Sequence, residues 1–166
     1  YALGLCRIEP ENNVHVILEA MEGLEIPLVF VGNWNNSEYG RDLKARYIES
    51  SNLFLLDPIY DPGALYAVRA RASVYLHGHS AGGTNPSLVE MVHFGIPILA
   101  HGCAFNRYST EGKARYFESA AELAEQMRIL SPEDAGQIGD NMRELAQRKY
   151  TWHQIGKAYF DLLDRA

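Results

Sequence analysis

Cysteine is scarce in this chain: only Cys6 and Cys103 occur among 166 residues, and they form no CxxC pair. Both lie in apolar, strand-like stretches, so we expect buried, reduced thiols rather than a disulfide or a cysteine metal site. Reduced thiols are typical of cytoplasmic proteins, and the cytoplasm is therefore the expected location of this chain.

Long apolar runs, basic charge and the common nucleotide-binding signatures are also missing. No stretch reaches the roughly 18 apolar residues that span a bilayer, and the formal net charge of −6 argues against a nonspecific nucleic-acid binder. The loop after the first predicted strand reads CRIEPENN, which is not the GxGxxG of nicotinamide-dependent oxidoreductases. The GxxxxGK phosphate loop and a nucleophile elbow are absent too.

What is present is an ordinary globular composition, with 47% hydrophobic and 22% charged residues. The length suits one domain over residues 1–166. Because the chain starts directly with strand-like YALGLCRI and has no initiator Met, we expect it to be a cut piece of a longer protein.

Apolar runs typical of buried strands alternate with apolar residues at helical spacing. The predicted strands are residues 2–8, 27–31, 53–56, 73–77, 97–100 and 116–117, and the predicted helices are residues 12–21, 37–50, 61–71, 86–94, 119–130, 131–149 and 152–163. This order predicts an α/β fold: a Rossmann-like parallel sheet with helices on both faces and a helical C-terminal tail. Ligands of such sheets bind beyond the carboxyl ends of the strands.

Residues 75–90, YLHGHSAGGTNPSLVE, follow the fourth predicted strand. Gly82, Gly83 and Thr84 come just before a helix that opens at Asn85 and continues with proline. Glycines let the backbone approach a ligand closely, and the free N–H groups at a helix N-terminus attract anions. We therefore predict a diphosphate site in this turn.

Two charged residues near these loops, Arg7 and Glu90, each have two alternative roles. Arg7, at the end of the first strand, suits bidentate phosphate binding, but it could instead pair with Glu9 or Glu11 on the surface. Glu90, about one turn into the helix, could accept two hydroxyls of a ribose or be a solvated helix residue. Its apolar flanks favour a carboxylate with partners.

Histidine and asparagine side chains are also predicted near the carboxyl ends of the strands. His77 and His79 are two residues apart, but a metal site needs at least a third ligand. We therefore predict no metal, a hydrogen-bonded core position for His77, and a phosphate or sugar-hydroxyl contact for His79. Asn12 and Asn13 are predicted to cap the first helix, although one amide could also reach ligand oxygens. Residues 57–60, DPIY, could hold a flat base or form a plain loop.

Together these features resemble the C-terminal, nucleotide-sugar-binding domain of GT-B-fold glycosyltransferases of family 4, the glycosyl transferases group 1 family. CRIEPENNVHVILEA is similar to the family's opening strand, loop and helix, and GGTNPSLVEMVHFGIPILA to its signature of two glutamates separated by seven residues. YTWHQIGKAYFDLL resembles the terminal helix, here within residues 151–166, that crosses back toward the N-terminal domain. HGHSAGGTNPSLVE with EPENN looks most like bacterial rhamnosyltransferases of capsule and O-antigen assembly.

The resemblance implies roles for individual residues. Arg7 takes the position of the arginine, and Asn12 that of the lysine, that contact the donor diphosphate in the family. Glu90 takes the position of the glutamate that binds the nucleotide ribose. Asp57 and Ile59 belong to the loop that holds the base.

The other signature glutamate falls on Gly82, so the usual carboxylate that contacts the donor sugar is missing. The resemblance still implies the donor-binding domain of a retaining glycosyltransferase, which moves a sugar such as rhamnose from a UDP-sugar or dTDP-sugar to a polysaccharide or lipid-linked acceptor. No cofactor is implied. The acceptor site and catalytic groups would lie in a missing N-terminal domain, which could also attach the enzyme to the inner face of the membrane, and this domain alone is expected to be inactive.

Two alternatives remain open at this stage. A sugar-nucleotide epimerase of the same GT-B fold would release free UDP and a sugar without an acceptor. A non-catalytic nucleotide-binding module would bind nucleotide but show no transfer.

Overall fold

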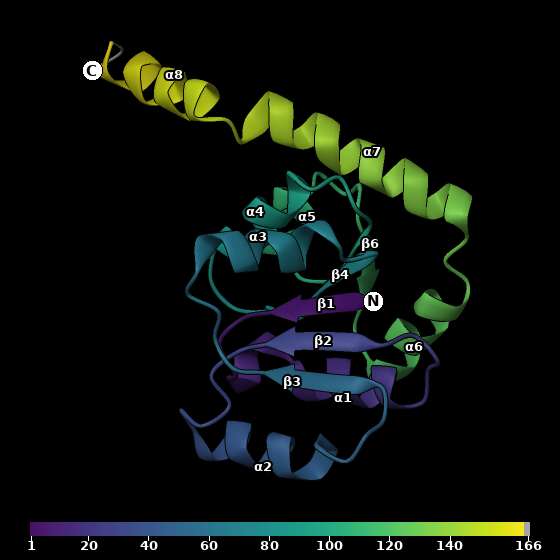
Figure 1. Ribbon diagram of the computed structural model, residues 1–166. Coiled ribbons are helices and arrows are strands. Elements are labelled where there is room, and N and C mark those ends of the chain that lie inside the picture. The colour runs from purple at the N-terminus through teal and green to yellow at the C-terminus, as the bar shows by residue number, and fades with distance from the viewer. Residues whose placement is uncertain (165–166) are drawn as a thin grey trace.

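The computed structural model describes residues 1–164 and contains a six-stranded sheet in the order β3-β2-β1-β4-β5-β6 (Figure 1). Every neighbouring pair of strands is parallel. The strands are β1 (Ala2–Leu5), β2 (Leu28–Val31), β3 (Leu53–Leu56), β4 (Val74–His77), β5 (Ile98–His101) and β6 (Arg115–Phe117). All six predicted strands are present, with ends that differ by up to three residues.

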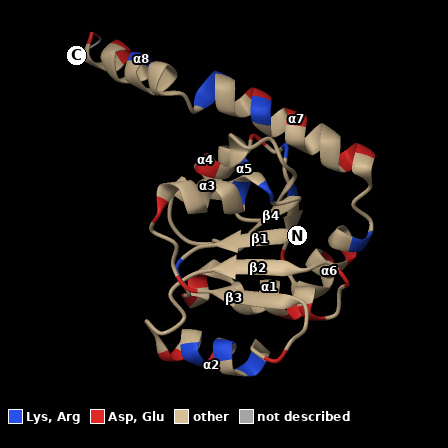
Figure 2. Cartoon of the chain, viewed as in Figure 1, with Lys and Arg blue, Asp and Glu red and all other residues tan. Residues whose placement is uncertain are grey.

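Helices cover both faces of the sheet (Figure 1). One core contains apolar residues of α1 (Val14–Glu22), α2 (Glu38–Tyr47) and α6 (Ala120–Arg128). The other contains residues of α4 (Pro86–Val92) and α7 (Pro132–Lys149), with Val68 of α3 (Pro62–Ala70) packed against it. The predicted Rossmann-like class with helices on both faces is confirmed. Figure 2 shows β1, β2 and β3 free of charged residues. The residues of β1 and β2 are mostly buried, whereas Phe54 and Leu56 of the edge strand β3 are 50% and 40% exposed.

The boundaries of most helices follow local capping chemistry. Ser37, Asp61 and Ser131 each accept a hydrogen bond from the backbone N–H three residues further on, which satisfies a donor that the helix leaves free. After α4 the chain turns at Gly95, whose φ of 62° lies in the left-handed region that favours glycine.

The start of α1 differs from its prediction. A short 3-10 turn, η1 (Pro10–Asn12), comes first, and Asn13 then adopts a left-handed φ of 46° at the N-cap position. The predicted capping by the two asparagines is wrong, because Asn13 Nδ2 donates to the Gly78 carbonyl instead. Asn12 is committed to contacts outside the helix.

One helix, α5 (Ala104–Ser109), lies where only a loop is predicted. It has six residues, which is too short for an apolar period to show. It follows Cys103, a residue type with no preference for the N-cap position. Asn106 of α5 is buried and contacts the loop after β4.

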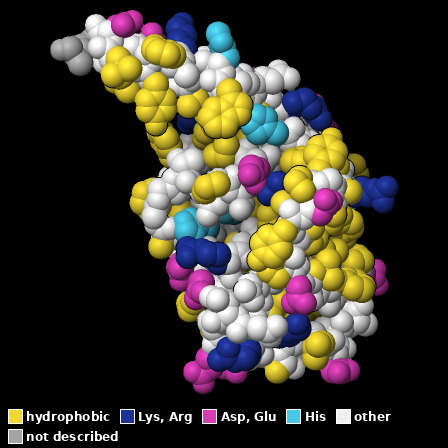
Figure 3. All heavy atoms as spheres, turned by 60° about the vertical axis from the view of Figure 1, so that its left-hand side comes forward, with side chains coloured by type: hydrophobic (Ala, Val, Ile, Leu, Met, Phe, Trp, Pro, Cys, Tyr) yellow, Lys and Arg dark blue, Asp and Glu magenta, His cyan; other side chains and the backbone are white. Residues whose placement is uncertain are grey.

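The last helix, α8 (Trp152–Leu163), extends away from the sheet beyond α7 (Figure 1). Five of its apolar side chains, Trp152, Tyr159, Phe160, Leu162 and Leu163, are between 65% and 89% exposed, and Figure 3 shows hydrophobic side chains gathered there. Of the predicted terminal segment 151–166, residues 165–166 lie outside the described part. No helix within residues 1–164 is both long and apolar enough to cross a lipid bilayer.

Candidate functional site

A cavity of about 450 Å³ opens at the carboxyl ends of β1, β2 and β3. It is lined by Leu5, Cys6, Arg7, Ile8, Val31, Gly32, Asn33, Asn36, Pro58, Ile59, Tyr60, Leu65 and Ser87. A largely apolar lining with a few polar groups suits a flat ring that carries hydrogen-bonding atoms. The cavity lies next to the junction of β1 and β4, where the strand order reverses and where open parallel sheets bind ligands.

The loop after β1 and the glycine-rich loop after β4 are joined side by side at this junction. Asn13 Nδ2 donates to the Gly78 carbonyl at 2.8 Å, and both the N–H and the hydroxyl of Ser80 donate to the Glu11 carbonyl at 2.9 Å. A Cβ on Gly78 would lie 2.1 Å from the Asn12 carbonyl oxygen, so the two backbones touch. A ligand bound to one loop therefore meets the other.

His79 is held at the junction from two sides. Its Nδ1 lies 2.7 Å from Asn12 Oδ1, and Asn106 Nδ2 donates to its carbonyl at 2.8 Å. Its Nε2 lies 3.6 Å from the point that a Cβ on Gly82 would occupy. The ring thus faces the turn in which the diphosphate site is predicted.

Asn12 stands behind His79 rather than at the surface of the loop. Its side chain is buried, with the residue only 2% exposed. Nδ2 donates to the Arg7 carbonyl at 2.8 Å, while Oδ1 faces His79. Both ends of the amide are therefore in use within the protein, and Asn12 holds His79 in place.

The turn itself presents mostly backbone. Gly82 has a φ of 96°, and Gly82, Gly83 and Thr84 are exposed. Asn85 caps α4, because its Oδ1 accepts from the Ser87 N–H at 2.9 Å. Of the predicted diphosphate residues here, the first three are open to a ligand, and Asn85 supports the turn.

Arg7 lies between the cavity and the turn. It lines the cavity, its side chain is 78% exposed, and Nη2 lies 3.9 Å from Glu11 Oε1. The surface ion pair between Arg7 and Glu11, which the sequence offered as one of two alternatives, is thus present. An exposed pair of this kind contributes little stability, so the guanidinium can move to an anion at low cost.

Glu90 has a partner of its own. Its Oε2 pairs with Nη2 of Arg69 on α3, and the Arg69 side chain is only 13% exposed. The Glu90 side chain is 53% exposed and lies outside the cavity lining. The carboxylate has the partner that its apolar flanks suggest, but it is not enclosed.

The predicted base-binding loop is divided. Ile59 and Tyr60 line the cavity. Asp57 lies outside that lining, with a side chain 71% exposed and Oδ1 3.5 Å from Lys44 Nζ. Only the apolar part of this loop therefore faces the space that a base could fill.

The remaining candidates are one core histidine and two partly buried cysteines, of which Cys6 lines the cavity. His77 is 1% exposed, and its Nδ1 lies 3.2 Å from Tyr75 Oη, as a hydrogen-bonded core histidine should be. Burial lowers the pKa of His77 to about 3, so its ring is neutral. Cys6 and Cys103 are free, partly buried thiols, and burial raises the pKa of Cys6 to about 12. Within the described residues, no three His, Cys, Asp or Glu side chains are grouped as a metal ion would require.

Neither a protein-family model nor a curated protein matches the chain by sequence. Solved structures do match it. HepE from Anabaena, solved in complex with UDP, has a TM-score of 0.84 at 16% identity, covering 100% of this chain and 49% of that one. The C-terminal domain of a glycosyl transferase group 1 family protein, LpcC from Francisella tularensis, gives 0.77 at 14% identity over 92% of this chain and 87% of that one. Sucrose-phosphate synthase from Thermosynechococcus elongatus gives 0.80 at 18% identity over 99% and 46%.

The chain has the fold of one half of a GT-B enzyme. It spans about half the length of the full-length structures that it matches, with 49% of HepE and 46% of the sucrose-phosphate synthase covered. Sequence identities of 14% to 18% support a shared fold and nothing more.

Sequence reasoning misses several residues of this GT-B-like half. Asn33, Asn36 and Ser87 line the cavity but have no predicted role. The Asn-rich stretch after the second strand, NWNN, is the signal that could have pointed to the first two. The hydrogen bond from Asn106 to the His79 carbonyl depends on α5, a helix that the sequence does not predict.

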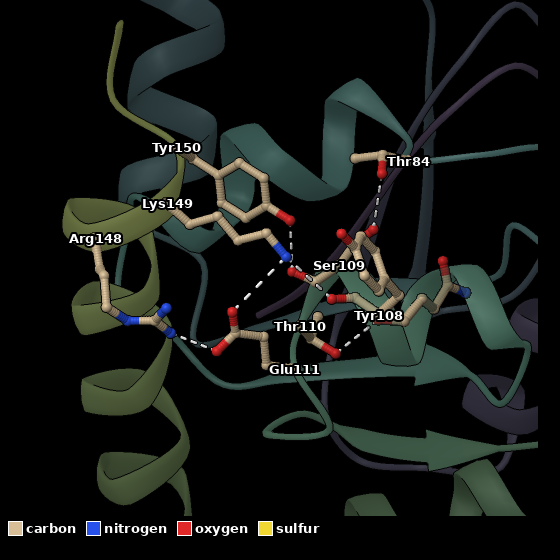
Figure 4. Close-up of polar contacts among 9 residues, drawn as sticks. Thr84, Tyr108, Ser109, Thr110, Glu111, Arg148, Lys149 and Tyr150 are labelled. Atoms are coloured by element: carbon tan, nitrogen blue, oxygen red, sulfur yellow. Dashed lines mark hydrogen bonds and ion pairs between the residues drawn. The ribbon is translucent and has the colours of Figure 1, made fainter. Parts of the chain in front are cut away.

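The turn after β4 is also tied to the end of α7 (Figure 4). Ser109 Oγ donates to Thr84 Oγ1 at 3.3 Å, and Tyr150 Oη donates to the Ser109 carbonyl at 2.8 Å. Glu111, close by in sequence, pairs with Arg148 and Lys149 of α7. The exposed turn and the helix that leads to α8 are therefore connected through α5.

Replacing Tyr150 by phenylalanine removes one of these connections. Loss of a single neutral hydrogen bond should lower the free energy of unfolding by about 1 kcal/mol, and urea denaturation measures it. The matched control is Tyr159→Phe, because Tyr159 is 68% exposed on α8 and should change stability much less. Equal effects of the two changes would show that the Tyr150 hydroxyl does not hold α7 to α5.

Proposed function

We propose that this chain is the donor-binding half of a glycosyltransferase and that its ligand is a nucleoside-diphosphate sugar. The observation that carries the proposal is the cavity at the carboxyl edge of the sheet, with Arg7 on its rim and the glycine turn beside it. The fold supports it, since HepE, which has the same fold, has been solved with UDP-glucose. UDP-sugars and dTDP-sugars are the donors to test, with rhamnose as one candidate sugar.

In this proposal the base of the nucleoside occupies the cavity and packs against Ile59 and Tyr60, while the ribose lies outside it. The diphosphate lies between Arg7, His79 and the exposed turn at residues 82–84, where charge-assisted hydrogen bonds hold it. Glu90, oriented by Arg69, accepts the ribose hydroxyls. Asn12 and Asn85 act from behind by fixing the loops.

The acceptor and the remaining catalytic groups belong, in the same proposal, to a second domain. The exposed apolar side chains of α8 support this, because monomeric proteins rarely leave such a surface uncovered. The transfer reaction itself is then a property of both domains, with this one holding the leaving nucleoside diphosphate and stabilising its charge.

A thermal-shift series with UDP, dTDP, GDP and ADP tests the donor site. A ligand present at about 100 times its Kd stabilises the folded state by about 2.7 kcal/mol, which should raise the Tm of a domain of this size by about 5–10 °C. Uridine serves as the control ligand, because it lacks the diphosphate. No shift with any nucleoside diphosphate would contradict the proposal.

The same assay separates the residue roles. Arg7→Ala should reduce the shift produced by the preferred diphosphate, because a charge-assisted hydrogen bond worth about 1.5–3 kcal/mol is lost. Glu90→Ala should also reduce this shift, because the proposed hydrogen bonds to the ribose hydroxyls are lost. Arg128→Ala is a matched control, since this arginine is 56% exposed in a short-range pair on α6 and should leave the shift unchanged.

A further inference from the structure

We propose that His79 binds the donor diphosphate only as an imidazolium, so that the chain takes up a proton when it binds a nucleoside-diphosphate sugar. This inference rests on the proposed donor site and adds a property of that site. It follows from which of the two ring nitrogens carries hydrogen in the free chain.

The orientation of the Asn12 amide determines which ring nitrogen of His79 carries the hydrogen. The Arg7 carbonyl can only accept, so the Asn12 atom 2.8 Å from it must be Nδ2. Oδ1 then faces His79 Nδ1 at 2.7 Å, and since an amide oxygen also only accepts, Nδ1 must donate. Rotating the Asn12 amide by half a turn, or moving the hydrogen of the His79 ring from Nδ1 to Nε2, would place two acceptors against each other. This position is buried, because Asn12 is only 2% exposed.

The other ring nitrogen faces the turn. With the hydrogen of the neutral ring on Nδ1, Nε2 carries a lone pair, 3.6 Å from the site of a Cβ on Gly82. Phosphate oxygens are acceptors and do not bind a lone pair. Nε2 can donate to them only after the ring gains a second proton, which it takes from the solvent.

The groups around His79 keep the free ring neutral near pH 7. Burial and the charge of Arg7 lower the pKa of His79, while Glu11 raises it. His77, with its ring centroid 6.1 Å away, is neutral and adds no opposing charge. Cys103 approaches the His79 backbone, with Sγ 3.6 Å from the carbonyl oxygen. A bound diphosphate brings negative charge to Nε2 and raises the pKa.

The sign of the pH dependence follows. Between the lowered pKa of the free chain and the raised pKa of the complex, binding takes up as much as about one proton. Affinity therefore falls as the pH rises through this window, by at most about tenfold for each pH unit. Below the free-state pKa the ring is already charged and the dependence disappears.

Isothermal titration calorimetry of the 166-residue chain tests this with UDP-glucose and dTDP-glucose. Both are diphosphate diesters that do not titrate near neutral pH, whereas the terminal phosphate of UDP does, with a pKa of about 6. Titrations at about pH 6.5 in PIPES and in bis-Tris, which have different heats of ionisation, give the number of protons exchanged. We expect different observed heats in the two buffers, corresponding to proton uptake.

Two substitutions assign the proton to His79. The Gln side chain of His79→Gln can donate from nearly the same place without titrating, so binding should persist while the proton uptake is lost. His153→Gln, on an exposed histidine of α8, should keep the uptake.

The outcomes separate the two claims. Binding with equal heats in both buffers across about pH 5–8, or an undiminished proton uptake in His79→Gln, overturns the role of His79 and leaves the donor site standing. If neither sugar nucleotide nor any free nucleoside diphosphate binds at any pH, the donor site fails as well.

Discussion

Replacing Trp34 by alanine should lower the free energy of unfolding by about 3–5 kcal/mol. Trp34 is fully buried, its ring meets Phe30 edge to face at a centroid distance of 5.5 Å, and its Nε1 donates to the Leu56 carbonyl at 2.9 Å. The substitution leaves a large cavity at the carboxyl ends of β2 and β3 and removes one of the two hydrogen bonds to the Leu56 carbonyl, which still accepts from the Gly32 N–H at 3.1 Å. Urea denaturation, followed by circular dichroism, measures the loss.

Trp152→Ala is the matched control for this change. Trp152 is 89% exposed on α8, and its loss should change the unfolding free energy by less than about 0.5 kcal/mol. Trp34 also lies between Asn33 and Asn36, which line the cavity, so Trp34→Ala should weaken nucleotide binding in addition. A loss of less than about 1 kcal/mol would show that the neighbouring loops close over the vacant space.

Replacing Gly78 by alanine should both destabilise the chain and disrupt the proposed donor site. The new Cβ would lie 2.1 Å from the Asn12 carbonyl oxygen, and neither backbone can yield without moving its loop. Overpacking of this kind costs about 1–3 kcal/mol. Because Asn13 also bonds to Gly78, the loops after β1 and β4 should separate, and the Kd for the preferred nucleotide should rise at least about tenfold, or 1.4 kcal/mol.

Gly83→Ala makes the same chemical change five residues along the same loop. A Cβ there would meet nothing within 4 Å, so the unfolding free energy should stay close to that of the parent chain. Comparable losses of stability in the two variants would show that alanine is disfavoured in this loop for reasons other than contact with Asn12.

The architecture could be predicted from the sequence because its signals are local. Uninterrupted apolar runs such as LVFV mark strands buried on both faces, and Asp61 followed by proline marks the start of a helix. The α5 helix could not be predicted, since six residues hold less than two turns and its cap position carries no capping side chain.

The position of the cavity was predictable from the sequence, but the contacts around it were not. Topology places it at the carboxyl edge, and the glycine turn lies beside it. The contacts between side chains cross long stretches of sequence and leave no local pattern. Asn12 is therefore predicted as a cap or a ligand contact, whereas its amide holds His79. Glu90 is predicted to have partners, but its flanking residues do not identify Arg69 as the partner or show that the carboxylate is half exposed.

The joined loops also bear on the order of events during folding. The hydrogen bonds from Asn13 to Gly78 and between Asn12 and His79 connect residues 65 and 67 positions apart. Such distant contacts form only after the intervening strands have found their places. The proposed donor site should thus be completed late, after the folding transition state, and a bound nucleotide should then slow unfolding while leaving the folding rate nearly unchanged.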